Sequence, residues 1–207
     1  MATKPFSVKG QNVTSPKGSA KWCKITEPDY TYDDKGTLST QLICNPDDPA
    51  VQAFIERLEE LRDKALAETK ETLGAKGKAY KAAPIFTEEK DSEEEPTGNI
   101  VFKFNLKKVD ERAENNHQST IIVVDAKRNK MAPSDVPLVG NGSVIRCVAF
   151  ANPYSMPNTK TVGISLIWNK MQLIDLVEYA ANDEFEDEDG YESADTDNDF
   201  DNEDDDF

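Results

Sequence analysis

Two stretches late in the chain decide the fold, NGSVIRCVAF at residues 141–150 and TVGISLIWNKMQLIDLV at residues 161–177. Asn141-Gly142 is a strong turn signal, because both residues accept the positive φ of a tight hairpin turn. The following residues are rich in β-branched and aromatic side chains, so we expect a strand at 143–150 and one long strand, or a bulged pair, at 161–177. No helix is expected after Gly140-Asn141-Gly142, which excludes a nucleotide-binding glycine loop there.

The earlier part of the chain predicts four more strands and one helix. The strands are expected at residues 20–26, 37–44, 100–109 and 120–125. Asp48 is a natural N-cap with Pro49 at the first helical position, and apolar residues recur from there at three- and four-residue spacing up to Gly74. About six strands with one main helix favour a Greek-key barrel over a sandwich. The predicted fold class is mostly β, a five- to six-stranded Greek-key barrel with one main α-helix.

Residues 75–98 show no periodicity. The stretch is basic in its first half, at Lys76-Gly77-Lys78, and acidic in its second half, at Glu93-Glu94-Glu95. We therefore expect a long mobile loop, a type of segment that often carries function.

The acidic residues are concentrated at the end of the sequence. Residues 183–207 hold 15 of the 40 Asp and Glu and none of the 24 Lys and Arg, so nearly all of the net charge of −16 lies there. With so few aliphatic residues, this segment cannot bury enough apolar surface to fold, and we expect a disordered tail. Residues 1–182 are expected to form one domain that is almost neutral by itself.

Residues 1–182 contain enough basic residues to form a basic surface. Its first 26 residues hold five lysines and no acid, and residues 97–182 hold ten basic against seven acidic residues. A low pI would ordinarily argue against a nucleic-acid partner, since phosphates require positive potential. Here that argument fails, because the acid is confined to one segment.

The last residues, Asp204, Asp205, Asp206 and Phe207, join an acidic run to an aromatic ring. Such a peptide can compete for a DNA groove or dock into a basic, hydrophobic pocket on a partner. The alternative reading of an acidic tail is a solubilising appendage.

The sequence offers little for catalysis, metal binding or membrane insertion. Cys23, Cys44 and Cys147 are widely spaced, which supports neither a disulfide framework nor a zinc site. The single histidine, His117, lies in a very polar loop. The acidic pairs at 33–34 and 47–48 occupy turn or cap positions where Asp is favoured on local grounds. No apolar run reaches 18 residues. We expect a non-enzymatic protein without cofactor or metal that does not enter a membrane.

What remains is a set of aromatic and basic residues interleaved on strands, the composition needed to stack unpaired bases while neutralising a phosphate backbone. Strand alternation sends Phe102 and Phe104 to one face and Lys103, Asn105 and Lys107 to the other. We expect the lysine side to face solvent and the phenylalanines, like Trp168, to lie in the core. Trp22, between Lys21 and Lys24, suits either packing or a base.

A family resemblance covers nearly the whole chain. The motifs that carry it are, in order, Glu27-Pro28-Asp29-Tyr30, Asp47-Asp48-Pro49, Val101-Phe102-Lys103-Phe104, Ile122-Val123-Val124-Asp125-Ala126-Lys127, Lys130-Met131, Asp135-Val136-Pro137-Leu138-Val139-Gly140, Asn152-Pro153-Tyr154, Leu176-Val177-Glu178 and Asp206-Phe207. Each motif is weak alone, but their order and spacing together are specific. The sequence resembles the single-stranded DNA-binding proteins of T7-type tailed bacteriophages.

The resemblance implies an OB-fold and sequence-independent binding, protection and annealing of single strands during phage DNA replication, recombination and repair in the cytoplasm of the infected host. It also implies a homodimer, and a tail that contacts the phage DNA polymerase and helicase-primase. No catalytic activity is implied.

The resemblance points to particular DNA-binding residues, namely Lys35, Lys76, Lys103, Asn105, Arg146 and Tyr154, and to Phe207 as the anchor of the tail. The chain departs from the family at Asn105, where similar proteins have a second lysine, and around Val144 and Val148, where this strand has fewer basic residues. A less electropositive groove and a lower affinity are expected.

Two alternatives from other classes stay open. An acidic-tailed chaperone or DNA mimic would use the tail as its primary binding site, so that deleting residues 183–207 would abolish its main activity. A cold-shock-like RNA-binding protein would use the same fold, and only a comparison of RNA with DNA oligonucleotides separates it.

Overall fold

The computed structural model describes residues 4–31, 33–110 and 117–178, so the acidic segment 183–207 with Phe207 lies outside the described residues. The elements in chain order, with η marking a 3-10 helix, are β1 (Gln11–Thr14), β2 (Gly18–Asp29), β3 (Thr37–Cys44), α1 (Pro49–Leu73), η1 (Gly74–Ala79), β4 (Lys81–Ala82), β5 (Thr87–Lys90), β6 (Pro96–Lys107), β7 (Val109–Asp110), β8 (His117–Gln118), β9 (Ile122–Val124), η2 (Pro133–Asp135), β10 (Val144–Met156) and β11 (Thr161–Asp175).

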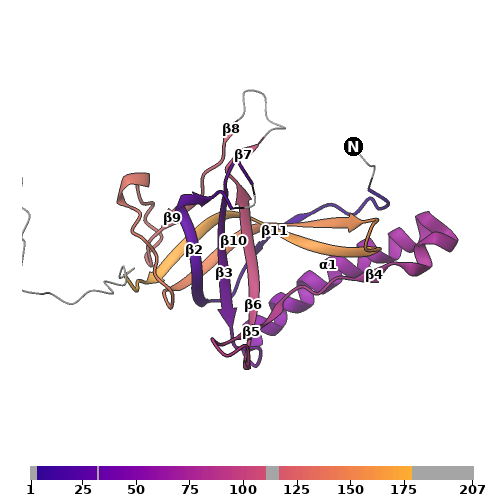
Figure 1. Cartoon of the computed structure of the whole chain (residues 1–207), viewed down its shortest axis with the longest axis horizontal. Helices are drawn as coiled ribbons and strands as arrows, with labels where there is room; N and C mark the ends of the chain where they lie inside the picture. The colour runs from indigo at the N-terminus through magenta and orange to yellow at the C-terminus, as the bar shows by residue number, and fades with distance from the viewer. Residues whose placement is uncertain (1–3, 32, 111–116, 179–207) are drawn as a thin grey trace, which may run out of the picture.

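A closed barrel forms the centre of the molecule (Figure 1). Its strands follow the order β10-β2-β3-β6-β11, and β11 pairs back with β10 to complete the ring. The neighbours are antiparallel except β6 and β11, which meet in a short parallel contact where Leu166 pairs with Phe104. The ring encloses the main hydrophobic core, and two residue pairs each join β10 to β2 and β6 to β11. The expectation of a mostly β OB-fold with one main helix is confirmed.

Strand alternation determines what the barrel encloses. On β6, Phe102 and Phe104 are buried, whereas Lys103, Asn105 and Lys107 between and after them are exposed. Trp168 on β11 is fully buried, so it belongs to the core as expected. The period of two therefore separates a packed inner face from a solvated outer face, and the outer face is the one available to a ligand.

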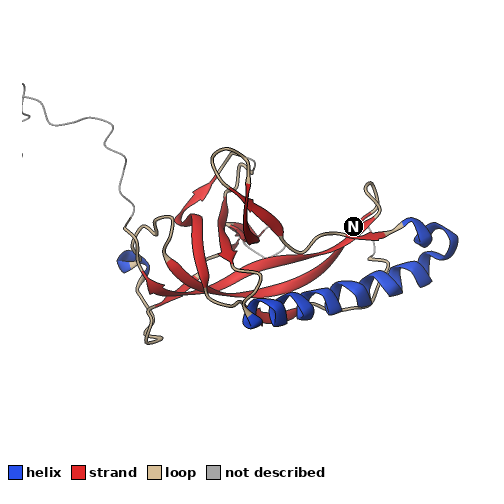
Figure 2. Ribbon diagram, turned by 90° about the horizontal axis from the view of Figure 1, so that it is seen from below, coloured by secondary structure: helices blue, strands red, loops and turns tan. Residues whose placement is uncertain are grey.

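Helix α1 covers the open end of the core. Asp48 caps it by accepting a hydrogen bond from the backbone N–H of Ala50 at 2.8 Å, and Pro49 occupies its first turn, as the sequence predicts. Phe54 on its buried face contacts Phe102 edge to face, with ring centroids 5.1 Å apart. The helix then runs beyond the barrel beside the end of the β10–β11 hairpin (Figures 1 and 2). We call this extension the arm. A small cluster of Phe6, Ala65, Tyr80 and Val162 packs inside it.

The expectation of a long loop at residues 75–98 is wrong in part. A 3-10 helix and two short strands lie within it, its last three residues already belong to β6, and β5 pairs antiparallel with the start of β6. The turn between them is held by Asp91, whose carboxylate accepts hydrogen bonds from the backbone N–H groups of Glu93 and Glu95. Most residues of β5 are exposed, so the strand shows no alternating pattern, and only its partner β6 explains why it forms.

Other boundaries differ by a few residues. Strand β6 starts at Pro96, four residues before the expected position, and β10 continues to Met156, because each gains a partner that its own sequence does not reveal. Strand β9 is shorter than expected, and β1 was not expected at all. The long stretch after residue 160 forms one strand, with bulges in its pairing to β10.

Candidate nucleic-acid interface

The outer face of β2, β3 and β6 carries a concentration of lysines between neutral polar side chains. We call it the lysine face, and its members are Lys21 and Lys24 on β2, Ser39 and Gln41 on β3, and Lys103, Asn105 and Lys107 on β6. The register places Lys21 opposite Gln41 and Gln41 opposite Lys103, so these three form a row across the strands. At the usual strand spacing, the row spans about 10 Å between its outer Cα atoms.

Two of these lysines form ion pairs with acidic side chains in the described part of the chain. The Lys107 ammonium donates a hydrogen bond to Oδ2 of Asp33 at 3.0 Å, and this bond lowers the pKa of the Asp33 carboxyl. Lys21 lies 4.0 Å from Oε1 of Glu89. No ion pair is found for Lys103 within the described part of the chain. The Lys107–Asp33 pair is open to solvent, where an ion pair is weak. The Glu89 carboxylate is more enclosed, because its side chain is 14% exposed and accepts hydrogen bonds from Thr97 and Asn99.

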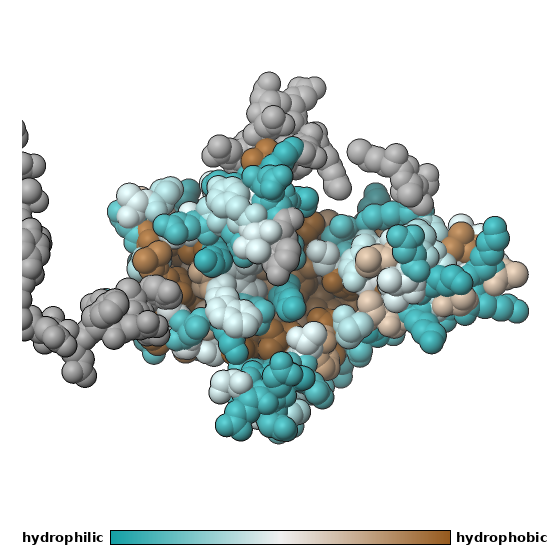
Figure 3. Space-filling view, in the orientation of Figure 1, coloured by the Kyte–Doolittle hydropathy of each residue, from teal (hydrophilic) through white to brown (hydrophobic). Residues whose placement is uncertain are grey.

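A groove of about 250 Å³ opens where the lysine face meets the arm. Lys103 and Asn105 of β6 line one side, and Tyr154 of β10 lines the other. The remaining lining comes from residues 84–87, residues 164–166 and Val101, and it mixes apolar with polar side chains. An apolar area beside β6, bordered by hydrophilic residues, is visible here in Figure 3. Three of the predicted site residues are thus brought together from two distant segments.

The ring of Tyr154 occupies space that is open because the residue opposite it, Gly163, has no side chain. Tyr154 pairs with Gly163 across the β10–β11 hairpin, and a Cβ built on Gly163 would lie only 2.5 Å from the tyrosine hydroxyl oxygen. The ring therefore lies over the glycine backbone, in space that any other residue would occupy. This arrangement leaves the half-buried aromatic ring at the groove wall, where a base can stack on it.

The other predicted residues lie elsewhere. Lys35 is in the turn before β3, and Lys76 is exposed on η1, beyond the far end of α1. Arg146 lies on β10 opposite Gln172, and its Nε is buried without a hydrogen-bond partner among the described residues. Trp22 is 59% exposed on β2 and does not line the groove.

Sequence reasoning missed Phe86, Ser165 and Gln41, which the fold adds to the groove or to the lysine face. The signal for Phe86 was the apolar triplet Pro84-Ile85-Phe86 inside an otherwise charged stretch. Phe86 contacts Phe102 edge to face with centroids 6.1 Å apart, which fixes this wall of the groove against the core.

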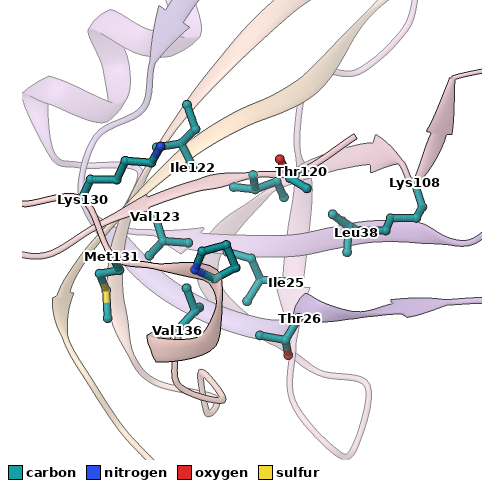
Figure 4. A pocket seen from close by; sticks show the side chains of 12 residues that line it. Ile25, Thr26, Leu38, Lys108, Thr120, Ile122, Val123, Lys130, Met131 and Val136 are labelled. Carbon is teal, nitrogen blue, oxygen red and sulfur yellow. The ribbon is translucent and has the colours of Figure 1, made fainter. Parts of the chain in front are cut away.

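A second cavity, of about 220 Å³, lies at one end of the barrel (Figure 4). Apolar side chains from β2, β3, β9 and the segment before Val136 converge on it, with Lys108 and Lys130 also in the lining. None of the predicted site residues lines this cavity. It is separate from the groove.

The described residues contain no group of three His, Cys, Asp or Glu side chains placed to hold a metal ion. Burial raises the pKa of the Cys23 thiol to about 11 and that of Cys44 to about 12, so both are neutral thiols near pH 7. Among the helices that the structure describes, none has an apolar stretch long enough to cross a membrane.

A small closed barrel with a basic outer face and an aromatic-walled groove defines a single-stranded nucleic-acid-binding protein of the OB-fold class. The family model of the single-stranded DNA-binding protein of bacteriophage T7 matches residues 17–176. The chain belongs to this family.

Solved structures agree on the fold. The crystal structure of gp2.5, a single-stranded DNA-binding protein encoded by bacteriophage T7, gives a TM-score of 0.68 at 23% identity, over 89% of this chain and 100% of that chain. The single-stranded DNA-binding protein of bacteriophage Enc34 in complex with single-stranded DNA gives 0.52 at 15% identity, over 84% of this chain and 94% of that one. The same Enc34 protein in a further structure gives 0.51 at 14% identity, over 86% and 92% of the two chains. The comparison with curated proteins gives no match.

Proposed function

We propose that this protein binds single-stranded DNA without sequence preference, through phosphate contacts on the lysine face and base stacking in the adjoining groove. The observation that carries the proposal is the convergence of Lys103, Asn105 and Tyr154 on one groove. Lysine neutralises phosphates whatever the sequence, and a tyrosine ring stacks on any base. Family membership and the Enc34 relative, whose structure is a complex with single-stranded DNA, support the choice of ligand.

The proposed setting is phage DNA replication, recombination, repair and strand annealing in the cytoplasm of an infected bacterium. In this setting a non-enzymatic protein would coat and protect single strands, and a homodimer would bring two strands close together. No metal or cofactor is needed for binding of this kind, because the lysines and the aromatic ring supply the interactions.

The test is a titration with labelled oligonucleotides of equal length as single-stranded DNA, duplex DNA and RNA, at several salt concentrations. We expect single-stranded DNA to bind far better than duplex, with log affinity falling against log salt by about 0.7 for each neutralised phosphate. Equal affinity for duplex would contradict the proposal. Preference for RNA would instead identify the protein as a cold-shock-like RNA binder.

We further propose that residues 183–207 compete with DNA and recruit the phage DNA polymerase and helicase-primase through Asp204, Asp205, Asp206 and Phe207. The support is the sequence, in which an acidic run leads to a single aromatic ring. Such a ring supplies a pocket contact that charge alone does not provide. Phe207→Ala should therefore lose much of the polymerase retained in a pull-down while keeping its affinity for DNA. Retention at the wild-type level would leave the segment with an electrostatic role only.

A further inference from the structure

Trp22 occupies a backbone position that tryptophan rarely takes. The register of β2 against β3 runs from Lys21 opposite Gln41 to Lys24 opposite Ser39, so that Trp22 and Cys23 together face the single residue Thr40. This is a β-bulge. Trp22, its first residue, has φ = 51°, the left-handed conformation that such bulges usually assign to glycine. A bulky side chain in this conformation is strained.

Among the described residues, the indole ring of Trp22 gains little packing that could offset this strain. Trp22 is 59% exposed, whereas Cys23 turns inward and packs against the core. The ring contact found for Trp22 is with Lys21, whose ammonium lies 5.1 Å from the ring centroid. A strained backbone that presents a large aromatic ring to solvent is typical of a binding position.

Asn141 holds this conformation in place. Its Oδ1 accepts a hydrogen bond from the backbone N–H of Trp22 at 2.8 Å. The turn that carries Asn141 is itself tied to β2, because the N–H of Gly142 donates to the carbonyl of Ala20 and the N–H of Ala20 donates to the carbonyl of Ser143. Hydrogen bonds from the neighbouring turn therefore hold the bulge at Trp22, and they fix the indole ring in its exposed position in the free protein.

The surroundings of Trp22 indicate the ligand. The ring belongs to the same outer surface as the row Lys21, Gln41 and Lys103, which leads across β3 to the groove at Tyr154. Two lysines separated by a glutamine, with an aromatic ring near each end of the row, match a phosphate backbone whose bases stack at both ends.

We propose that Trp22 is a second base-stacking position for single-stranded DNA, held ready by Asn141 as a positioning residue, and that the strand crosses β2, β3 and β6 between Trp22 and Tyr154. This inference rests on the proposed function and adds the path of the strand. On the other side of Trp22, strand β2 pairs with the start of β10. Arg146 lies there on the outward side of β10, so the path can continue past Trp22 toward Arg146.

Intrinsic fluorescence tests the proposal, because the other tryptophan, Trp168, is fully buried. Single-stranded DNA should quench the emission of the wild-type protein, and Trp22→Phe, which retains an aromatic ring, should show little quenching at saturating DNA. Trp22→Ala should weaken binding about 5- to 150-fold, the loss expected for one stacked base. Binding is measured separately by the anisotropy of a labelled oligonucleotide. Unquenched emission at saturating DNA, or wild-type affinity of Trp22→Ala, would overturn this inference but not the proposed function. No binding by anisotropy would overturn both.

Two further variants separate a stacking role from a structural one. Trp22→Gly should lose affinity to the same extent as Trp22→Ala while unfolding at the wild-type temperature or above it, because glycine accepts the left-handed backbone. A lower unfolding temperature would show that the ring supports the fold instead.

Asn141→Ala should speed the depolarisation of Trp22 emission in the free protein and reduce the quenching by DNA. The emission of Trp168 is measured separately in Trp22→Phe and subtracted. Unchanged depolarisation would remove Asn141 from the proposal.

Discussion

The ring of Tyr154 and the backbone of Gly163 act as one unit, because the glycine leaves the space that the ring fills. Tyr154→Ala should weaken binding of single-stranded DNA by about 1–3 kcal/mol, since one stacked base is lost. The fold should stay intact, because the ring is only half-buried at the groove wall. Equilibrium titration and far-UV circular dichroism check the two parts of this prediction.

Gly163→Ala provides an independent test of the same position. An added Cβ would meet the hydroxyl end of Tyr154 and force the ring away from the groove, so affinity should fall although the tyrosine is still present. Full affinity in both variants would mean that no base stacks at this place.

Replacing Lys103 on strand β6 tests whether this residue contacts the phosphate backbone or reads the base sequence. No acidic partner is found for it among the described residues, so its removal leaves no new unpaired carboxylate behind. Lys103→Ala should weaken binding to homopolymers and mixed sequences alike and flatten the log–log salt slope by about 0.7. Lys170→Ala, an exposed lysine on β11 outside the groove, is the charge-matched control. A loss confined to certain sequences, or an equal effect in the control, would contradict the assignment.

The turn before β3 contains an acid that competes with DNA for a lysine. Asp33 accepts a hydrogen bond from Lys107, and its lowered pKa keeps it ionised at neutral pH. Asp33→Asn should free Lys107, tighten DNA binding and steepen the salt slope by about 0.7. The asparagine retains the Oδ1 that accepts from the backbone N–H of Lys35, so the turn should persist.

Asp34→Asn is the control, since it removes the same charge from the same turn without being the Lys107 partner. If both variants tighten binding equally, only the net charge matters.

Elements with a local signature could be predicted from the sequence. The alternation of Phe102, Lys103 and Phe104 indicated both faces of β6, and Asp48 with Pro49 marked the start of α1, because each pattern depends on neighbouring residues alone. Strand β5 lacked a pattern of its own, since it is mostly exposed and forms through pairing with β6. The αL backbone of Trp22 contradicts local propensity, and only the clamp from Asn141 makes it understandable.

At the scale of the whole molecule, barrel closure creates the site. Tyr154 and Lys103 are about fifty positions apart in the sequence, and they share a groove because β11 pairs with β6 on one side and β10 on the other. Strand patterns and the distribution of charge along the chain predicted a mostly β protein with basic surface, but the register that joins these strands depends on long-range contacts, which local patterns do not contain.

The distribution of charge over the whole chain leads to the last prediction. A segment with 15 acidic residues is tethered to a nearly neutral body that carries the lysine face, so its effective concentration near that face is high. Its attraction acts mainly within a Debye length of about 8–10 Å at ordinary salt. Deleting residues 183–207 should therefore tighten binding of single-stranded DNA, most at low salt where screening is weakest. A full-length variant with the acidic residues of this segment changed to Asn and Gln should behave like the deletion, since it removes charge and keeps length. Unchanged or weaker binding by both proteins would exclude competition with DNA, and loss of all binding would favour the acidic-tailed chaperone or DNA mimic instead.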